Sequence, residues 1–226
     1  GKLAHFTRSG VWGPEMTYNR RIVNEISVTA GDILPLNEVK SYLRVDGDAD
    51  DELILGFIDA AIGSAEKYMG RSIRQKVLEA VMDGFPSAYD HDALDRLGPG
   101  SHTISLAVFT NGTREIDLAY GPVSAITSIT TYDRDNTSAV LTSAAYFLNG
   151  DRVTLNDGYS WPADLRRRAS VVVRYSVGWG ASLPAMVRVA LMQHISAMYD
   201  CRMGCEAPEG CKALLQPFRV MDMLAW

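Results

Sequence analysis

The clearest pattern of hydrophobic and polar positions in the chain lies between Leu36 and Gly70. Asp50 is placed to cap the N-terminus of a long helix there, and Gly70 supplies a C-terminal stop. A shorter helix, capped by Asn37 and ending near Leu43, is predicted to precede it. Apolar residues in the long helix recur three and four positions apart, which is the spacing of one buried helix face: Leu53, Ile54, Phe57, Ile58, Ala61, Ile62, Ala65, Tyr68 and Met69.

Between residues 72 and 180 the pattern changes to short strand-like runs, separated by turn signals such as Asn149-Gly150 and Asp157-Gly158. Frequent turns between short strands are typical of an antiparallel β-subdomain. A polar stretch, residues 87–101, is predicted to be a loop within it. The predicted strands are Val77–Met82, Thr103–Phe109, Glu115–Leu118, Ile126–Tyr132, Tyr146–Leu148, Arg152–Leu155 and Ser170–Ser176.

The chain then returns to a helical pattern, over about residues 183–216. Pro184 is favourable in a first helical turn, and a second, shorter helix is predicted over Glu209–Leu215. The order of helices, strands and helices predicts an α+β fold. In this fold the N- and C-terminal helices form one framework, into which the antiparallel β-subdomain is inserted. The apolar stripe of the first of these helices consists of Val187, Leu191, Ile195 and Met198.

The two ends of the chain have no sustained period. Residues 1–31 are predicted to be an extended arm with a short strand at Ile22–Val28. Residues 32–220 are predicted to form the main domain, and residues 221–226 an apolar C-terminal tail. Exposed apolar side chains in an arm or a tail are unfavourable in an isolated subunit, so we expect both ends to pack on another surface.

Composition narrows the classes of function. The chain has 226 residues and a formal net charge of −5, with few clusters of Lys and Arg. Such a protein is a poor nucleic-acid binder, because phosphate contacts require clustered cations. No apolar run approaches the roughly 20 residues that span a bilayer. No signal-peptide pattern is present either, so we expect synthesis in the cytoplasm and no membrane contact.

The acidic turn between the first two predicted helices resembles a calcium loop. Asp46, Asp48 and Asp50 match the start of an EF-hand loop, but the positions that require Gly and a bidentate Glu carry Asp51 and Phe57. We therefore interpret these acids as turn and cap residues.

The cysteines offer a second metal hypothesis. His194 with Cys201, Cys205 and Cys211 gives four potential zinc ligands, but the paired knuckles of structural zinc sites are absent from this spacing. Reduced thiols at the end of a helix and in the following loop are the favoured interpretation.

Motifs of catalysis are lacking. The sequence contains no phosphate-binding glycine loop, no H-E-x-x-H and no G-x-S-x-G. His91, between Asp90 and Asp92, could bind a metal, although a solvated loop explains this trio more simply. We therefore expect no enzyme activity, no catalytic residue, no cofactor and no metal, and keep a metal-dependent enzyme as the less favoured alternative.

Several segments, in their order along the chain, resemble the head-tail connector (head-completion adaptor) proteins of long-tailed bacteriophages, prophages and gene transfer agents. The run L-N-E-V-K-S-Y-L-R-V-D from Leu36 to Asp46 is followed by D-D-E-L-I-L from Asp50, and later by Gly70-Arg71. Three further pieces agree: Asp83–Pro86, Gly121–Ile129, and Tyr175–Gly180 with Leu183-Pro184. The resemblance covers roughly residues 32–220.

This resemblance implies a structural subunit of a virion or phage-like particle, located at the head-tail junction and made in the cytoplasm of a bacterial host. Members assemble as a ring of about twelve copies between the portal protein and a tail-side stopper or terminator protein. DNA passes through the central channel without sequence-specific binding. A tail-completion or stopper protein of the same kind of particle is the alternative.

The apolar C-terminal residues are the candidates for partner binding. We expect them to dock on the portal or on a neighbouring subunit, because so many apolar side chains at a chain end require burial. Packing on the chain's own core is the competing interpretation. The candidates are Phe218, Met221, Met223, Leu224 and Trp226.

Overall fold

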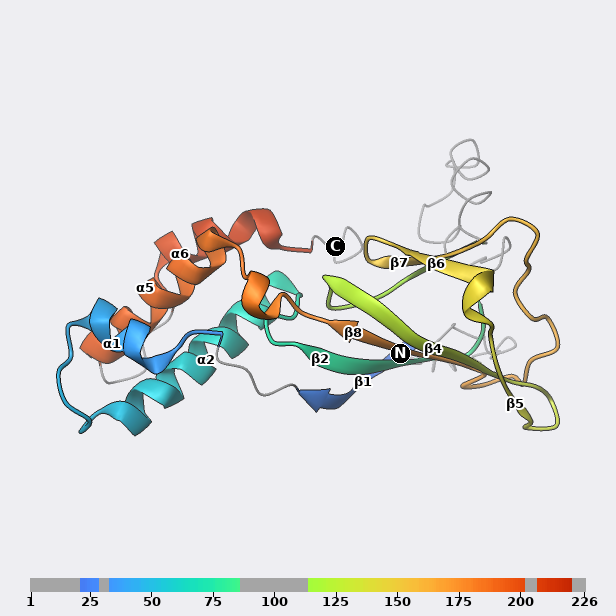
Figure 1. Cartoon of the computed structure of the whole chain (residues 1–226), viewed down its shortest axis with the longest axis horizontal. Coiled ribbons are helices and arrows are strands. Elements are labelled where there is room, and N and C mark those ends of the chain that lie inside the picture. The colour runs from blue at the N-terminus through green and yellow to red at the C-terminus, as the bar shows by residue number, and fades with distance from the viewer. Residues whose placement is uncertain (1–20, 29–32, 86–113, 202–206, 221–226) are drawn as a thin grey trace, which may run out of the picture.

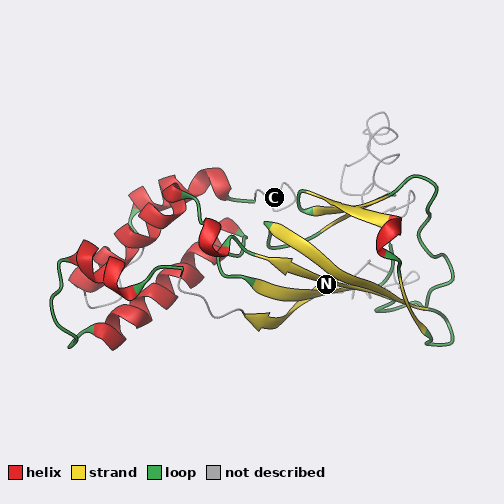
Figure 2. Ribbon diagram, in the orientation of Figure 1, coloured by secondary structure: helices red, strands yellow, loops and turns green. Residues whose placement is uncertain are grey.

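The computed structural model describes residues 21–28, 33–85, 114–201 and 207–220. Helices gather at one end of the molecule and strands at the other (Figure 1). The strands form one larger and one smaller sheet beside the helical part (Figure 2). The predictions for Thr103–Phe109, for the loop at 87–101 and for the first part of the arm lie outside the described residues.

After strand β1, the elements follow the predicted order of helices, then strands, then helices. The helices are α1 (Leu36–Leu43), α2 (Asp51–Met69), α5 (Ala185–Cys201) and α6 (Glu209–Leu215), with short 3₁₀ helices η1 (Ser143–Ala145), η2 (Gly180–Ser182) and η3 (Gln216–Phe218). The strands are β1 (Arg21–Val28), β2 (Lys76–Met82), β3 (Glu115–Asp117), β4 (Val123–Tyr132), β5 (Ser138–Val140), β6 (Tyr146–Asn149), β7 (Arg152–Leu155) and β8 (Val171–Val177). The predicted α+β class is confirmed.

Four helices build the first hydrophobic core. The buried face of α2 packs against α5 and α6, and α1 closes one side. Gly70 ends α2 with a positive φ of 67°, the left-handed conformation that glycine adopts without steric cost. The core draws its side chains from residues 33–73 and 183–215, so the N-terminal and C-terminal helices do form one framework.

The strands build the second core. The larger sheet has the order β1-β2-β8-β4-β5, and all its pairs are antiparallel; the smaller sheet has the order β3-β7-β6. Alternate residues of β8 are buried, as expected for a strand with one face on a core. All the buried side chains of this core come from residues 78–177, which lie within the insertion predicted at about residues 72–180.

Two details differ from the sequence-based expectations, and a third agrees with them. Pro35 occupies the N-cap position of α1, and Asn37 lies inside the helix, where its side chain accepts a hydrogen bond from the N–H of Glu38. The short strand predicted at Ile22–Val28 in the arm is confirmed as β1, which pairs with β2 at the edge of the sheet. Strand β5 was not predicted, because its Ser-Ala-Val sequence is fully exposed and carries no alternation.

None of the helices among the described residues is both long enough and apolar enough to cross a lipid bilayer.

Candidate functional site

The two cores meet at a junction made of loops. The segment after α2 lies beside the segment between β3 and β4, where the N–H of Ser72 donates to the carbonyl of Tyr120 at 3.1 Å. The segment after β8 joins them, because the N–H of Gly180 donates to the carbonyl of Ile73 at 3.1 Å. Three parts of the chain that are distant in sequence are therefore hydrogen-bonded together at this point.

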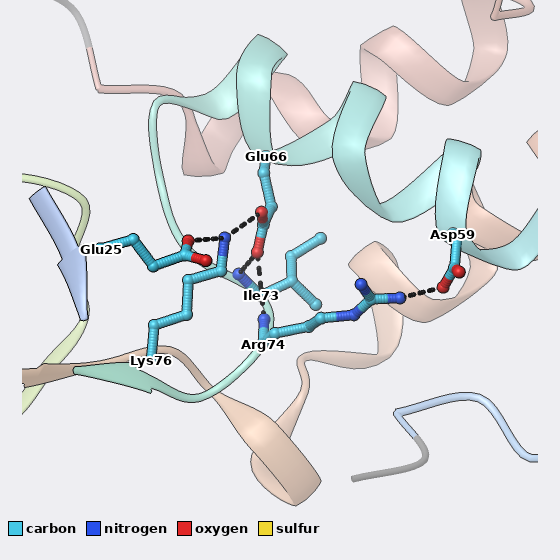
Figure 3. A network of polar contacts seen from close by, with 6 residues as sticks. All are labelled: Glu25, Asp59, Glu66, Ile73, Arg74 and Lys76. Carbon is cyan, nitrogen blue, oxygen red and sulfur yellow. Dashed lines mark hydrogen bonds and ion pairs between the residues drawn. The ribbon is translucent and has the colours of Figure 1, made fainter. Parts of the chain in front are cut away.

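Glu66, near the C-terminal end of α2, is the central polar residue of the junction (Figure 3). Its Oε1 accepts hydrogen bonds from the backbone N–H groups of Ile73 at 2.7 Å and Arg74 at 3.1 Å. Its Oε2 pairs with Nζ of Lys76 at 2.9 Å, and Lys76 also pairs with Glu25 of β1 at 3.3 Å. One carboxylate thus connects a helix to the first residue of a strand.

The charge of Lys76 is stabilised at this site. Burial acts to lower the pKa of Lys76, but its hydrogen bonds to Glu66 and Glu25 and the attraction of the two carboxylates outweigh burial, so the pKa lies above the usual 10.5. Both Lys76 and Glu66 are largely buried, with 16% of each side chain exposed. A largely buried ion pair with satisfied hydrogen bonds fixes geometry more effectively than an exposed one.

A second group of polar residues, around Arg71, binds the described end of the C-terminal segment, residues 218–220. Arg71 donates from Nε to the carbonyl of Phe218 at 2.9 Å and pairs through Nη1 with Asp151 at 3.1 Å. The N–H of Val220 donates to the carbonyl of Met69 at 2.8 Å. The carboxylate of Asp151 lies so close to Gly121 that a Cβ there would collide with it, which explains a glycine at that position.

Of the five candidate partner-binding residues, the described part of the chain contains Phe218. Its ring packs edge-on against Trp179, with 6.0 Å between ring centroids, and it contacts the helical core. Phe218 therefore anchors the C-terminal segment to its own subunit. Met221, Met223, Leu224 and Trp226 lie outside the described residues, and their docking stays a prediction.

The acidic turn connects helices. Lys40 of α1 pairs with Asp51 at 2.6 Å and with Asp48 at 3.1 Å, and the hydrogen bond to Asp51 raises the pKa of Lys40. Asp50 occupies the N-cap position of α2 but makes no side-chain cap bond there. Its carboxylate instead accepts from the hydroxyl of Tyr199 in α5 at 2.7 Å. These acids serve helix packing.

Three of the four potential zinc ligands, His194, Cys201 and Cys211, lie in the described part of the chain, where no group of three His, Cys, Asp or Glu side chains is placed to hold an ion. His194 and Cys211 line a cavity of about 60 Å³, and burial lowers the pKa of His194 and raises that of the Cys211 thiol. Cys205 and the trio around His91 lie outside the described residues.

Cys201 corrects one expectation. It is disulfide-bonded, whereas Cys211 is a free, buried thiol. The prediction of reduced thiols is therefore wrong for Cys201, because spacing in a sequence does not show whether two sulfur atoms meet in space.

Sequence reasoning missed the junction. Glu25, Lys76 and Asp151 belong to no motif, and Arg71 enters only through the Gly70-Arg71 pair of the family resemblance. For Glu66 the available signal is indirect: it is a carboxylate one turn before the Gly70 stop of α2.

Comparison with known proteins places these features in a family context. Residues 34–96 match the family model of the phage gp6-like head-tail connector protein. The comparison with curated protein sequences gives no match.

Solved structures resemble most of the chain. A chain in the virion of a native gene transfer agent (GTA) particle is 20% identical, with a TM-score of 0.65 over 91% of this chain and 98% of that one. A chain in the neck of an empty GTA particle, computed with C6 symmetry, gives the same values. A chain in the neck of a native GTA particle, computed with C12 symmetry, gives a TM-score of 0.63 at the same identity and coverage. At this identity the likeness is one of fold, and the predicted resemblance to head-tail connector proteins is confirmed by the family model over residues 34–96.

Proposed function

We propose that this protein is a structural head-tail connector subunit of a phage-like particle and has no catalytic role. The family match over residues 34–96 carries the proposal, and the likeness in fold over 91% of the chain supports it. The described polar residues also fit a structural role, since the ion pairs at the junction hold the two cores together. Synthesis in a bacterial host cytoplasm, followed by incorporation at the head-tail junction, is part of the same proposal.

The assembled form that we propose is a ring of about twelve copies. Chains of the same fold lie in necks computed with C6 and C12 symmetry, which supports cyclic assembly. A closed ring requires a head-to-tail contact between unlike faces of neighbouring subunits. The net charge of −5 suits a DNA channel, because an acidic wall lets phosphates pass without gripping them.

The C-terminal segment is the proposed contact to the portal protein, with a stopper or terminator protein on the tail side of the ring. Phe218 and Arg71 fix the start of this segment on the subunit. The residues beyond Val220 therefore start from a defined point on the subunit. Within the segment, Met221, Met223, Leu224 and Trp226 carry the apolar surface, and Ala225 contributes little.

A binding experiment tests the docking segment. Deletion of residues 221–226 should weaken binding to the portal protein at least about tenfold, because buried apolar and aromatic anchors dominate such interfaces. Leu224→Ser should weaken binding markedly, whereas Ala225→Ser, its matched control, should change affinity less than about twofold. Unchanged binding after the deletion would show that the portal contact lies elsewhere.

Electron microscopy of particles tests the connector role itself. The subunit should lie in the neck, between the portal and the tail. Its presence on the tail side of a separate connector ring would favour the stopper assignment, and its absence from the particle would refute the proposal.

A further inference from the structure

A groove of about 420 Å³ lies between the C-terminal half of α2 and the edge of the larger sheet. Val23, Leu78 and Tyr120 supply apolar lining, and Gly63 forms part of the helix side. This volume lies within the range of cavities that bind peptide side chains or small ligands.

The described part of the chain leaves the helix side of the groove uncovered. A Cβ added to Gly63 would meet no atom within 4 Å, so nothing there requires a glycine, although glycine is less favourable than alanine inside a helix. Lys67, on the same side, is exposed and makes no ion pair among the described residues, whereas the groove's other cations, Arg71 and Lys76, are paired. The groove therefore offers open space, apolar lining and one spare positive charge.

The C-terminal segment begins beside this groove. Val220 is hydrogen-bonded to Met69, and its Cβ lies 3.7 Å from the Cβ position of Gly70. Arg71, the next residue, both lines the groove and holds Phe218. Six residues in extended conformation reach about 20 Å, which is enough to enter the groove from this point.

The sequence of the segment complements the lining. Met221, Met223, Leu224 and Trp226 are apolar, and Asp222 carries its one negative charge. Apolar side chains suit Val23, Leu78 and the ring of Tyr120, while Asp222 suits Lys67.

We propose that residues 221–226 occupy this groove in their own subunit before assembly. In this state the apolar side chains of the segment are shielded from solvent, and Asp222 pairs with Lys67. This inference rests on the proposed function only in that the segment must leave the groove to dock on the portal.

Cross-linking in the full-length protein tests the proposal. A photoreactive benzoylphenylalanine at position 224 should form bonds to α2 or β1, located by mass spectrometry, and mixed ¹⁴N and ¹⁵N subunits should show these bonds within single chains. Gly63→Leu fills the groove and should reduce their yield about tenfold, the effect of losing a modest packing contact. The matched control, Gly56→Leu on the same exposed helix face but outside the groove, should change the yield less than about twofold.

Both leucine variants should fold, since neither position has a neighbour within 4 Å, and unchanged thermal unfolding checks this. Bonds between differently labelled chains would assign the groove to a neighbour's segment and overturn the proposal, as would bonds elsewhere or equal effects of the two variants. Portal binding is scored separately. A separate outcome is that the cross-links of the full-length protein lie within single chains while the variant that lacks residues 221–226 still binds the portal. This pair of results would refute the docking role alone and leave the groove proposal intact.

Discussion

The helical core and the sheet core of this subunit draw their buried side chains from different parts of the chain. The helical core joins residues 33–73 to residues 183–215, which are the two flanks of the fold. The sheet core is made within residues 78–177, and strand β1 covers one edge with exposed apolar side chains at Ile22, Ile26 and Val28. Each core buries its own apolar side chains, and the contact between them is largely polar.

This difference indicates that apolar and polar contacts contribute differently to the fold. Apolar burial supplies most of the stability but has little directional preference. Hydrogen bonds and ion pairs at Glu66 and Arg71 have fixed geometry and set the orientation of the helices relative to the sheets. The following predictions test whether the two cores respond independently and whether the junction joins them.

The largest effect is expected inside the helical core. Ile54→Ala removes a fully buried side chain of α2 and should lower the free energy of unfolding by about 2–5 kcal/mol, because it leaves a cavity. Denaturant unfolding measures this loss. Leu55→Ala, next to it but 49% exposed, is the control and should cost less than about 0.5 kcal/mol.

Hydrogen exchange shows where the loss occurs. In Ile54→Ala the amides of α2 and α5 should lose protection while those of β2 and β8 keep most of theirs. Equal loss of protection in both regions would mean that the two cores unfold as one unit and do not differ in local stability.

A smaller effect is expected at the junction. Glu66→Ala removes the acceptor of two backbone N–H groups and one partner of Lys76, and should cost about 2–3 kcal/mol. Glu79→Ala is the control, since its partner Arg174 is 55% exposed, and should cost less than about 1 kcal/mol. Calorimetry measures both. Equal costs would show that Glu66 acts as an ordinary surface charge.

The smallest effect is expected from acid. Burial lowers the pKa of His194 below its usual 6.5, so the unfolded chain binds a proton more readily than the folded one. Stability from this residue is present above pH 6.5 and is lost as the pH falls through the lowered pKa. Wild type should therefore lose more stability than His194→Gln between pH 7.5 and pH 5, measured by chemical denaturation. Parallel curves would exclude this contribution.

The helices could be predicted because their signals are local. The bounds Glu209–Leu215 and the stop at Gly70 follow from apolar spacing and terminal residues within one segment. The cap at Asn37 was wrong because Pro35 is the N-cap of the helix, two residues earlier than the side-chain preference suggests. Such errors affect the ends of an element and leave its existence intact.

The arrangement of the strands and the junction could not be predicted in this way. Alternation in Val171–Val177 shows which face is buried, but it does not show that Lys76–Met82 lies on one side and Val123–Tyr132 on the other. The pairing of Glu66 with Lys76 depends on where α2 ends relative to β2, which is a tertiary property. The disulfide of Cys201 was missed for the same reason.

The path of the chain between the two cores has a mechanical consequence. The backbone crosses from one core to the other between β1 and α1, between α2 and β2, and between β8 and α5. A pull that separates the helical end from the sheet end is therefore shared by three covalent connections in parallel. A single proteolytic cut in one of them would leave the two halves tethered by the other two.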